Sequence, residues 1–242
     1  MAAEFSLGTL SDTPIVITNF VGNLDPQDTF SFNLPNSGVS INVVVTGLSA
    51  NTDVDVKVFK DLNSNGIVDG IDTEVGTSSR RGTSDEAINI ANQGAGPYVA
   101  QVDPFSNNTS GYNLRLSTTG FGSPSNLLSS DVLVGVLTSS RNFKDSLRNN
   151  DTSDIYNFIV NTAGSFTFTL DPVESVDPDL RLIQDINSNS VVDPGEVITT
   201  SSVSFGSNDV ITNFLNPGDN YFIQVYQFFG DPINYSLSAT PV

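Results

Sequence analysis

Apolar and polar residues alternate with a period of two through much of the chain. Phe30, Phe32 and Leu34 are separated by polar residues, and the same alternation runs through residues 54–58 and 166–170. Successive side chains of a β-strand point to opposite faces, so this pattern predicts strands with one buried face. Many short strands joined by Gly, Asn, Asp and Pro predict antiparallel β-sandwiches and an all-β fold.

Helical periodicity is rare, and residues 141–150 are the one candidate for a turn of helix. Phe228 and Phe229 are adjacent on an expected strand, so their side chains point to opposite faces, and one of them is expected either to be exposed or to be buried at the domain interface. Five tyrosines lie on expected strands, and we expect them to pack in the core, with a sugar-binding surface as the alternative. They are Tyr98, Tyr112, Tyr221, Tyr226 and Tyr235.

The chain contains an internal repeat. Asp28–Phe32 matches Asp154–Phe158, and other segments recur at a nearly constant offset of 123–127 residues. A repeat of this length is a whole domain rather than a unit of a solenoid. Gly, Ser and Pro in residues 119–126 indicate a linker. The sequence therefore predicts two domains, residues 1–121 and 122–242.

Two copies of an acidic loop carry the clearest chemical signal. Each copy has oxygen-bearing side chains at positions 1, 3, 5, 9 and 12, the ligand spacing of a calcium loop in which position 7 adds its backbone carbonyl. In loop 1 (residues 61–72) the predicted ligands are Asp61, Asn63, Asn65, Ile67, Asp69 and Asp72. In loop 2 (residues 185–196) they are Asp185, Asn187, Asn189, Val191, Asp193 and Glu196.

The two loops differ at two positions. Gly66 suits the sharp turn at position 6, whereas Ser190 stands there in loop 2, which makes loop 1 the stronger candidate. Asp72 is one carbon shorter than Glu196, so the nearby Glu74 could assist or replace it. Three carboxylates per loop predict moderate affinity, with dissociation constants of about 10⁻⁴–10⁻³ M.

A simpler interpretation of each loop is a solvated turn without metal, because Asn-Gly in a polar stretch is itself a turn signal. A plain turn does not require acids at both positions 9 and 12, repeated in a second loop. We therefore expect about two calcium ions. The flanking residues Thr73–Ser79 and Val197–Thr200 do not have the pattern of EF-hand helices, and they predict hairpin insertions. The loops themselves resemble the calcium loop of dockerins.

Composition narrows the possible functions. The net charge is −18 with only nine basic residues, so nucleic-acid binding is not expected. His and Cys are absent, which removes the common soft-metal ligands and the common general base. No catalytic Gly-x-Ser-x-Gly elbow is present, so we do not expect an enzyme. No apolar run approaches the ~20 residues of a membrane span, and the first residues do not resemble a secretory signal, so we expect no membrane insertion.

Each repeat resembles the bacterial pre-peptidase C-terminal domain, a jelly-roll-like β-sandwich. The resembling motifs are Leu24–Phe32, the Asp-x-Asp strand Asp53–Phe59, and the closing segments Asn216–Tyr226 and Asn234–Leu237. The resemblance implies two tandem jelly-roll-like sandwiches. It also implies a non-catalytic module of secreted bacterial proteins, often attached to peptidases and related to collagen-binding domains. The usual peptidase partner is absent from these 242 residues.

We therefore expect a calcium-binding, non-catalytic module, extracellular or on the cell surface, that serves adhesion, matrix assembly or accessory binding. Two alternatives stay open. One is a module that binds an extracellular polysaccharide or a fibrous protein. The other is a surface-layer or filament subunit that associates with copies of itself, since exposed sheet edges can pair.

Overall fold

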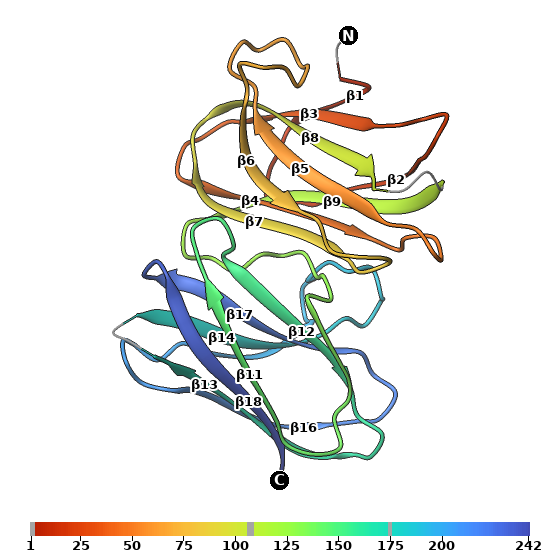
Figure 1. Cartoon of the computed structure of the whole chain (residues 1–242). Coiled ribbons are helices and arrows are strands. Elements are labelled where there is room, and N and C mark those ends of the chain that lie inside the picture. The colour runs from red at the N-terminus through yellow and green to blue at the C-terminus, as the bar shows by residue number, and fades with distance from the viewer. Residues whose placement is uncertain (1–2, 106–108, 174–175) are drawn as a thin grey trace. The chain divides into compact units, whose positions relative to one another are not determined.

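The computed structural model describes residues 3–105, 109–173 and 176–242. The chain forms two compact units, Met1–Phe121 (unit 1) and Gly122–Val242 (unit 2). The described residues form strands, turns and bends without a helix, which confirms the all-β fold. Figure 1 shows the strands of each unit in layers.

Unit 1 is built from two sheets. The five-stranded sheet has the order β1-β3-β8-β5-β6, and the four-stranded sheet has the order β2-β9-β4-β7. The strands of the first sheet are β1 (Phe5–Thr9), β3 (Asp28–Leu34), β8 (Gly96–Pro104), β5 (Val54–Lys60) and β6 (Thr73–Ser78). The strands of the second are β2 (Ile15–Val21), β9 (Ser110–Gly120), β4 (Val39–Thr46) and β7 (Glu86–Gln93).

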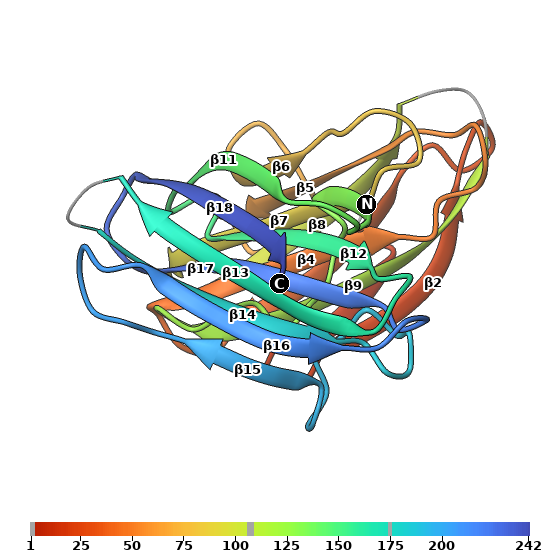
Figure 2. The ribbon, with the colours of Figure 1, turned by 90° about the horizontal axis from the view of Figure 1, so that it is seen from below.

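Unit 2 repeats this topology strand by strand. Its sheets have the orders β10-β12-β17-β14-β15 and β11-β18-β13-β16, and Figure 2 shows β18, β13 and β16 next to one another. The strands of the first sheet are β10 (Val132–Val136), β12 (Ser153–Ile159), β17 (Tyr221–Phe229), β14 (Asp177–Gln184) and β15 (Val197–Ser201). The strands of the second are β11 (Arg141–Leu147), β18 (Ile233–Pro241), β13 (Gly164–Pro172) and β16 (Asp209–Leu215).

Two details of the strands differ from the expectation. β1 pairs with β3, and β10 with β12, in parallel, whereas the other named pairs are antiparallel. Between the two parallel strands the chain forms one strand of the opposite sheet, so the second parallel strand runs in the same direction as the first. Residues 141–150 do not form a helical turn, because Arg141–Leu147 is the edge strand β11, paired antiparallel with β18. Most of its side chains are exposed polar groups, which hides the period of two.

The core of each unit lies between its two sheets. Phe30, Phe32 and Leu34 are buried in unit 1, as their alternation predicts, and Phe166 and Phe168 are buried in unit 2. All five predicted tyrosines are also buried. A buried tyrosine usually finds a partner for its hydroxyl, and acidic side chains accept the hydroxyls of Tyr112, Tyr221 and Tyr235.

Candidate metal centres

The two acidic loops connect neighbouring antiparallel strands. Loop 1 joins β5 to β6, and the residues at its ends, Lys60 and Thr73, are partners in the sheet. Figure 1 shows this connection extending past the ends of the strands. Loop 2 joins β14 to β15 and is closed by a hydrogen bond from the Gln184 N–H to the Glu196 carbonyl (2.9 Å). Both loops are therefore hairpin insertions flanked by strands.

The first and last acids of loop 1 bind backbone amides of the loop. Asp61 Oδ2 accepts the Gly66 N–H at 2.8 Å. Asp72 accepts the N–H of Leu62 through Oδ1 and that of Asp69 through Oδ2, both at 2.9 Å. Position 12 thus connects the two ends of the loop, and position 1 fixes the turn at Gly66. Asp61 is only 3% exposed, whereas most of the loop is open to solvent.

The side chains at positions 3, 5 and 9 of loop 1 converge. Asn63 Nδ2 and Asn65 Nδ2 each donate to Asp69 Oδ2 at 3.0 Å. The Ile71 N–H, followed by these two amides, lowers the pKa of Asp69 because all three stabilise the carboxylate form. Rotation of each side-chain amide by 180° would exchange its nitrogen and oxygen. The oxygen, which can bind a metal, would then face Asp69.

Loop 2 has the same internal arrangement. Asn187 Nδ2 and Asn189 Nδ2 donate to Asp193 Oδ2, both at 2.8 Å. Glu196 accepts the N–H of Ile186 and that of Asp193, also at 2.8 Å. In addition, Asp185 Oδ2 accepts the Ser190 N–H at 3.1 Å.

Position 6 is left-handed in both loops. Gly66 has φ +69°, and Ser190 has φ +58° despite its side chain. The left-handed conformation costs a non-glycine residue about 1–2 kcal/mol. Replacement of Gly by Ser in loop 2 therefore leaves the loop conformation intact at a modest energetic cost.

The donor set of both loops fits a hard cation. Each loop supplies three carboxylates, two side-chain amides and the backbone carbonyl of position 7, which is Ile67 or Val191. All of these ligands offer oxygen, which calcium prefers over nitrogen or sulfur. The structure brings positions 1, 3, 5, 9 and 12 of each loop into one hydrogen-bonded group.

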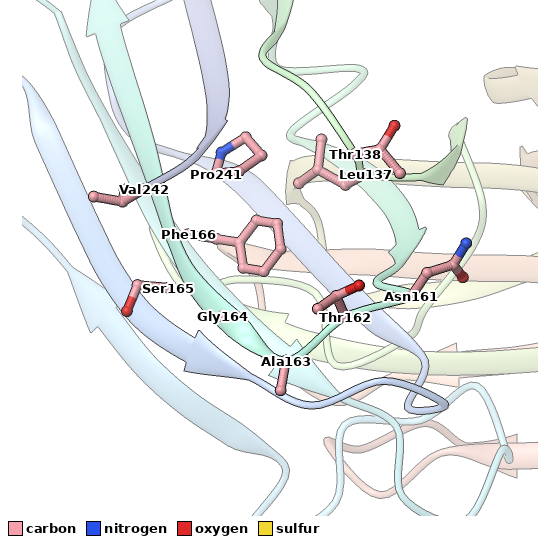
Figure 3. Close-up of a pocket in the computed structure, with 10 residues that line it drawn as sticks. All are labelled: Leu137, Thr138, Asn161, Thr162, Ala163, Gly164, Ser165, Phe166, Pro241 and Val242. Carbon is pink, nitrogen blue, oxygen red and sulfur yellow. The ribbon is translucent and has the colours of Figure 1, made fainter.

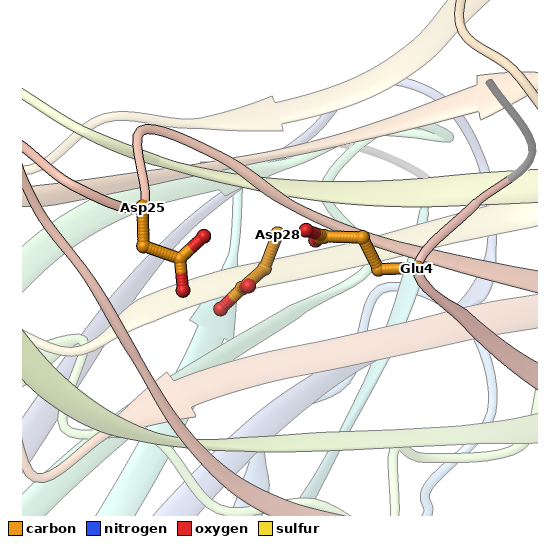
Figure 4. A group of neighbouring side chains, drawn as sticks. All are labelled: Glu4, Asp25 and Asp28. Atoms are coloured by element: carbon orange, nitrogen blue, oxygen red, sulfur yellow. The ribbon is translucent and has the colours of Figure 1, made fainter.

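A further group of acids in unit 1 was not singled out as a site in the sequence. One carboxylate oxygen from each of Glu4, Asp25 and Asp28 lies within 4.8 Å of the other two, and Figure 4 shows the three carboxyl groups turned toward a common point. Asp28 is buried and accepts a hydrogen bond from the Tyr112 hydroxyl. Burial, with Asp25 and Glu4 nearby, raises the pKa of Asp28 to about 6.

Unit 2 contains a counterpart of this group. Asp154 is buried and accepts the Tyr235 hydroxyl at 2.6 Å. Burial, followed by the charge of Asp151, raises the pKa of Asp154. Asp131 Oδ2 accepts the Ile155 N–H, as Glu4 Oε2 accepts the N–H of the equivalent residue in unit 1. The Asp-x-x-Asp spacing, present in both repeats, was the one sequence signal for these groups of acids. The third acid of each group, Glu4 or Asp131, is distant in sequence from the other two.

Unit 2 also has an open cavity of about 220 Å³ at the end where β13 begins (Figure 3). Its lining residues include Leu137, Asn161, Phe166 and Val242. None of the residues that line it carries an ionisable side chain, and none belongs to loop 2. This cavity therefore offers no acid–base pair of the kind that catalysis commonly uses.

The sequence comparisons classify part of unit 1. Residues 26–104 match the family described as bacterial pre-peptidase C-terminal domain. These domains are C-terminal, non-catalytic parts of peptidases, which fits a non-catalytic module. The match contains loop 1 and the strands on both sides of it. No curated protein sequence matches the chain.

Several solved structures are similar to part of the chain. The pre-peptidase C-terminal domain of a collagenase from Bacillus anthracis is 19% identical, with a TM-score of 0.37 over 45% of this chain and 92% of that one. The g-type lysozyme inhibitor PliG of Aeromonas hydrophila is 20% identical, with a TM-score of 0.31 over 46% and 96%. The Yersinia pseudotuberculosis-derived mitogen is 13% identical, with a TM-score of 0.32 over 43% and 86%.

Within the described ranges, no helix has the length and apolar character needed to span a bilayer.

Proposed function

We propose that the chain is a calcium-binding, non-catalytic module in which loop 1 and loop 2 each hold one ion. The observation that carries this proposal is the shared arrangement of the two loops. Both place two side-chain amides on the carboxylate of position 9, and both use positions 1 and 12 to bind the loop backbone. In both loops this arrangement gathers three carboxylates, two side-chain amides and one backbone carbonyl, which is the all-oxygen donor set that calcium prefers.

The ion's role is to fix a long hairpin connection. An ordered loop loses conformational entropy, and a cation that binds only the ordered form offsets that loss. Binding also relieves part of the self-repulsion in a chain of net charge −18. At 10 mM calcium, a dissociation constant of about 10⁻⁴–10⁻³ M stabilises the folded form by about 1.4–2.7 kcal/mol per site.

Calorimetric titration of the metal-free chain tests the proposal. We expect two sites for calcium and a higher melting temperature in calcium than in chelator. Asp69→Asn should remove the site in loop 1, and Asp193→Asn should remove the site in loop 2. Both substitutions keep the size of the side chain, so a loss of binding reports the lost charge. Calcium that produces neither heat nor a change in melting temperature would sink the proposal.

We propose that the module is located outside the cell, on the cell surface or in a matrix, and that it serves adhesion or accessory binding. The match of residues 26–104 to a bacterial domain family that accompanies peptidases supports this setting. The moderate affinity predicted for the loops also suits an environment with millimolar calcium. Fractionation of the source cells with an antibody to the chain tests the location, and confinement to the cytoplasm would contradict it.

A second candidate function, binding of a polysaccharide or fibrous protein, is supported by exposed aromatic residues. Phe105 follows β8 and is 72% exposed, and its counterpart Phe228 near the end of β17 is 49% exposed. Phe229 is also exposed and contacts Phe205 edge-on, with ring centres 5.4 Å apart. Phe105→Ser and Phe228→Ser should each weaken co-sedimentation with a polymer that binds the chain. Unchanged co-sedimentation of both variants would exclude these side chains.

A further inference from the structure

Loop 2 is held by a segment from the start of unit 2. This connector (Ser125–Asp131) runs antiparallel to the middle of loop 2, with Leu127 opposite Val191. The Leu128 N–H donates to the Ser190 carbonyl, and the Val192 N–H donates to the Asn126 carbonyl, both at 2.9 Å. Positions 6 and 8 of loop 2 are therefore fixed from outside the loop.

The connector is itself firmly anchored within unit 2. Leu127 is 0% and Leu128 1% exposed. Leu128 belongs to an apolar cluster with Ile155, Ile183 and Phe222, and Val192 of loop 2 packs against the same cluster. Two anchored hydrogen bonds and a shared apolar contact thus connect loop 2 to the strands behind it.

A second set of contacts fixes the start of the connector. The Ser125 carbonyl accepts hydrogen bonds from the buried side chains of Arg181 (2.5 Å) and Gln224 (3.2 Å). Burial lowers the pKa of Arg181 to about 10, and it remains charged at neutral pH. A charged donor makes a stronger hydrogen bond than a neutral one, so the connector has a rigid base.

These contacts surround the residue that offers its backbone to the ion. Position 7 of loop 2 is Val191, whose neighbours on both sides are hydrogen-bonded to the connector. Val191 is 7% exposed, whereas Ile67 at the same position of loop 1 is only partly buried. A ligand that is held in place before binding loses less freedom on binding, which raises affinity.

We propose that the connector preorganises loop 2 for calcium, with Leu128 as a positioning residue. The inference rests on the proposed function.

Calorimetry on the full chain separates the two sites. With Asp69→Asn, only loop 2 is left to titrate, and with Asp193→Asn only loop 1. No binding by either variant would overturn the proposed function itself.

A comparison of two truncations isolates the connector. Leu128→Ala in the Asp69→Asn background should weaken loop 2 by at least about fivefold. Leu170→Ala is the matched control, because Leu170 is also fully buried in unit 2 but lies in the core on β13. It should leave the affinity unchanged. An equal effect of the two truncations, or no effect of Leu128→Ala, would refute a positioning role.

Hydrogen exchange provides a measurement on the unsubstituted chain if a truncated variant does not fold. Binding and preorganisation are reciprocal, so calcium should slow exchange of the Leu128 and Val192 amides. The Asp193→Asn variant should lose this protection, whereas Asp69→Asn should retain it. Calcium bound at loop 2 without slower exchange at either amide would overturn the inference.

Discussion

Glu86 provides a test of how buried acids affect stability. It is 0% exposed, at the start of β7. The carboxylate accepts the Ser78 hydroxyl and the Arg80 N–H, the latter at 2.8 Å through Oε1. Burial raises its pKa from 4.5 to about 7, and these hydrogen bonds reduce the shift without cancelling it.

The sign of the resulting pH dependence follows from proton binding. The folded chain holds the Glu86 proton more tightly than the unfolded chain does. The stability that this group contributes is therefore fully present below pH 4.5 and is lost as the pH rises through about 7. Each pKa unit corresponds to about 1.4 kcal/mol, so the total loss is up to about 3 kcal/mol.

Glu86→Gln removes the titration and keeps the shape of the side chain. Urea unfolding of both proteins at pH 4.5 and pH 8, followed by circular dichroism, gives the free energy of unfolding. We expect the wild type to lose up to about 3 kcal/mol more than Glu86→Gln over this range. The difference should persist in high salt, because salt does not screen the cost of burial. Parallel pH profiles of the two proteins would refute this reasoning.

Three further substitutions have expected effects on thermal or urea unfolding. Lys60→Met removes an ammonium that donates to two backbone carbonyls and lies 4.1 Å from the centre of a tyrosine ring, and should cost about 1–2 kcal/mol; an unchanged midpoint would contradict it. Tyr235→Phe removes the hydroxyl that donates to buried Asp154 and should lower the free energy of unfolding by about 1.5–3 kcal/mol at neutral pH. Surface substitutions commonly change this free energy by up to about 0.5 kcal/mol, so a change smaller than that would contradict the prediction. Gly230→Ala should destabilise, because Gly230 has φ +110° and an added Cβ would lie 2.9 Å from Val176 Cγ1; equal stability would show that the turn relaxes.

The alternation of side chains was sufficient to predict the all-β fold, because most strands bury one face. It failed at Arg141–Leu147, where an edge strand buries little and carries polar residues on both sides. The parallel pairing of β1 with β3 was also outside its reach. Alternation reports which face is buried, whereas the direction of a neighbouring strand depends on the path of the chain between sheets.

The spacing of acids was sufficient to predict which side chains of the two loops converge, because these residues are close in sequence. The contact between Leu128 and loop 2 was not predictable in this way, since the connector and the loop are about sixty residues apart. The same holds for Glu4, which joins Asp25 and Asp28 only through the fold. Long-range contacts depend on strand order, and no local pattern encodes it.

The pairing of Lys60 with Thr73 makes loop 1 a removable part of the hairpin. A connection that starts and ends on partner residues can be excised and replaced by a two-residue turn such as Asn-Gly without changing the strand register. By the same geometry, residues 61–72 could be transplanted onto the hairpin of an unrelated β-protein. The sheets of unit 1 would therefore keep their pairing whether or not the loop is present.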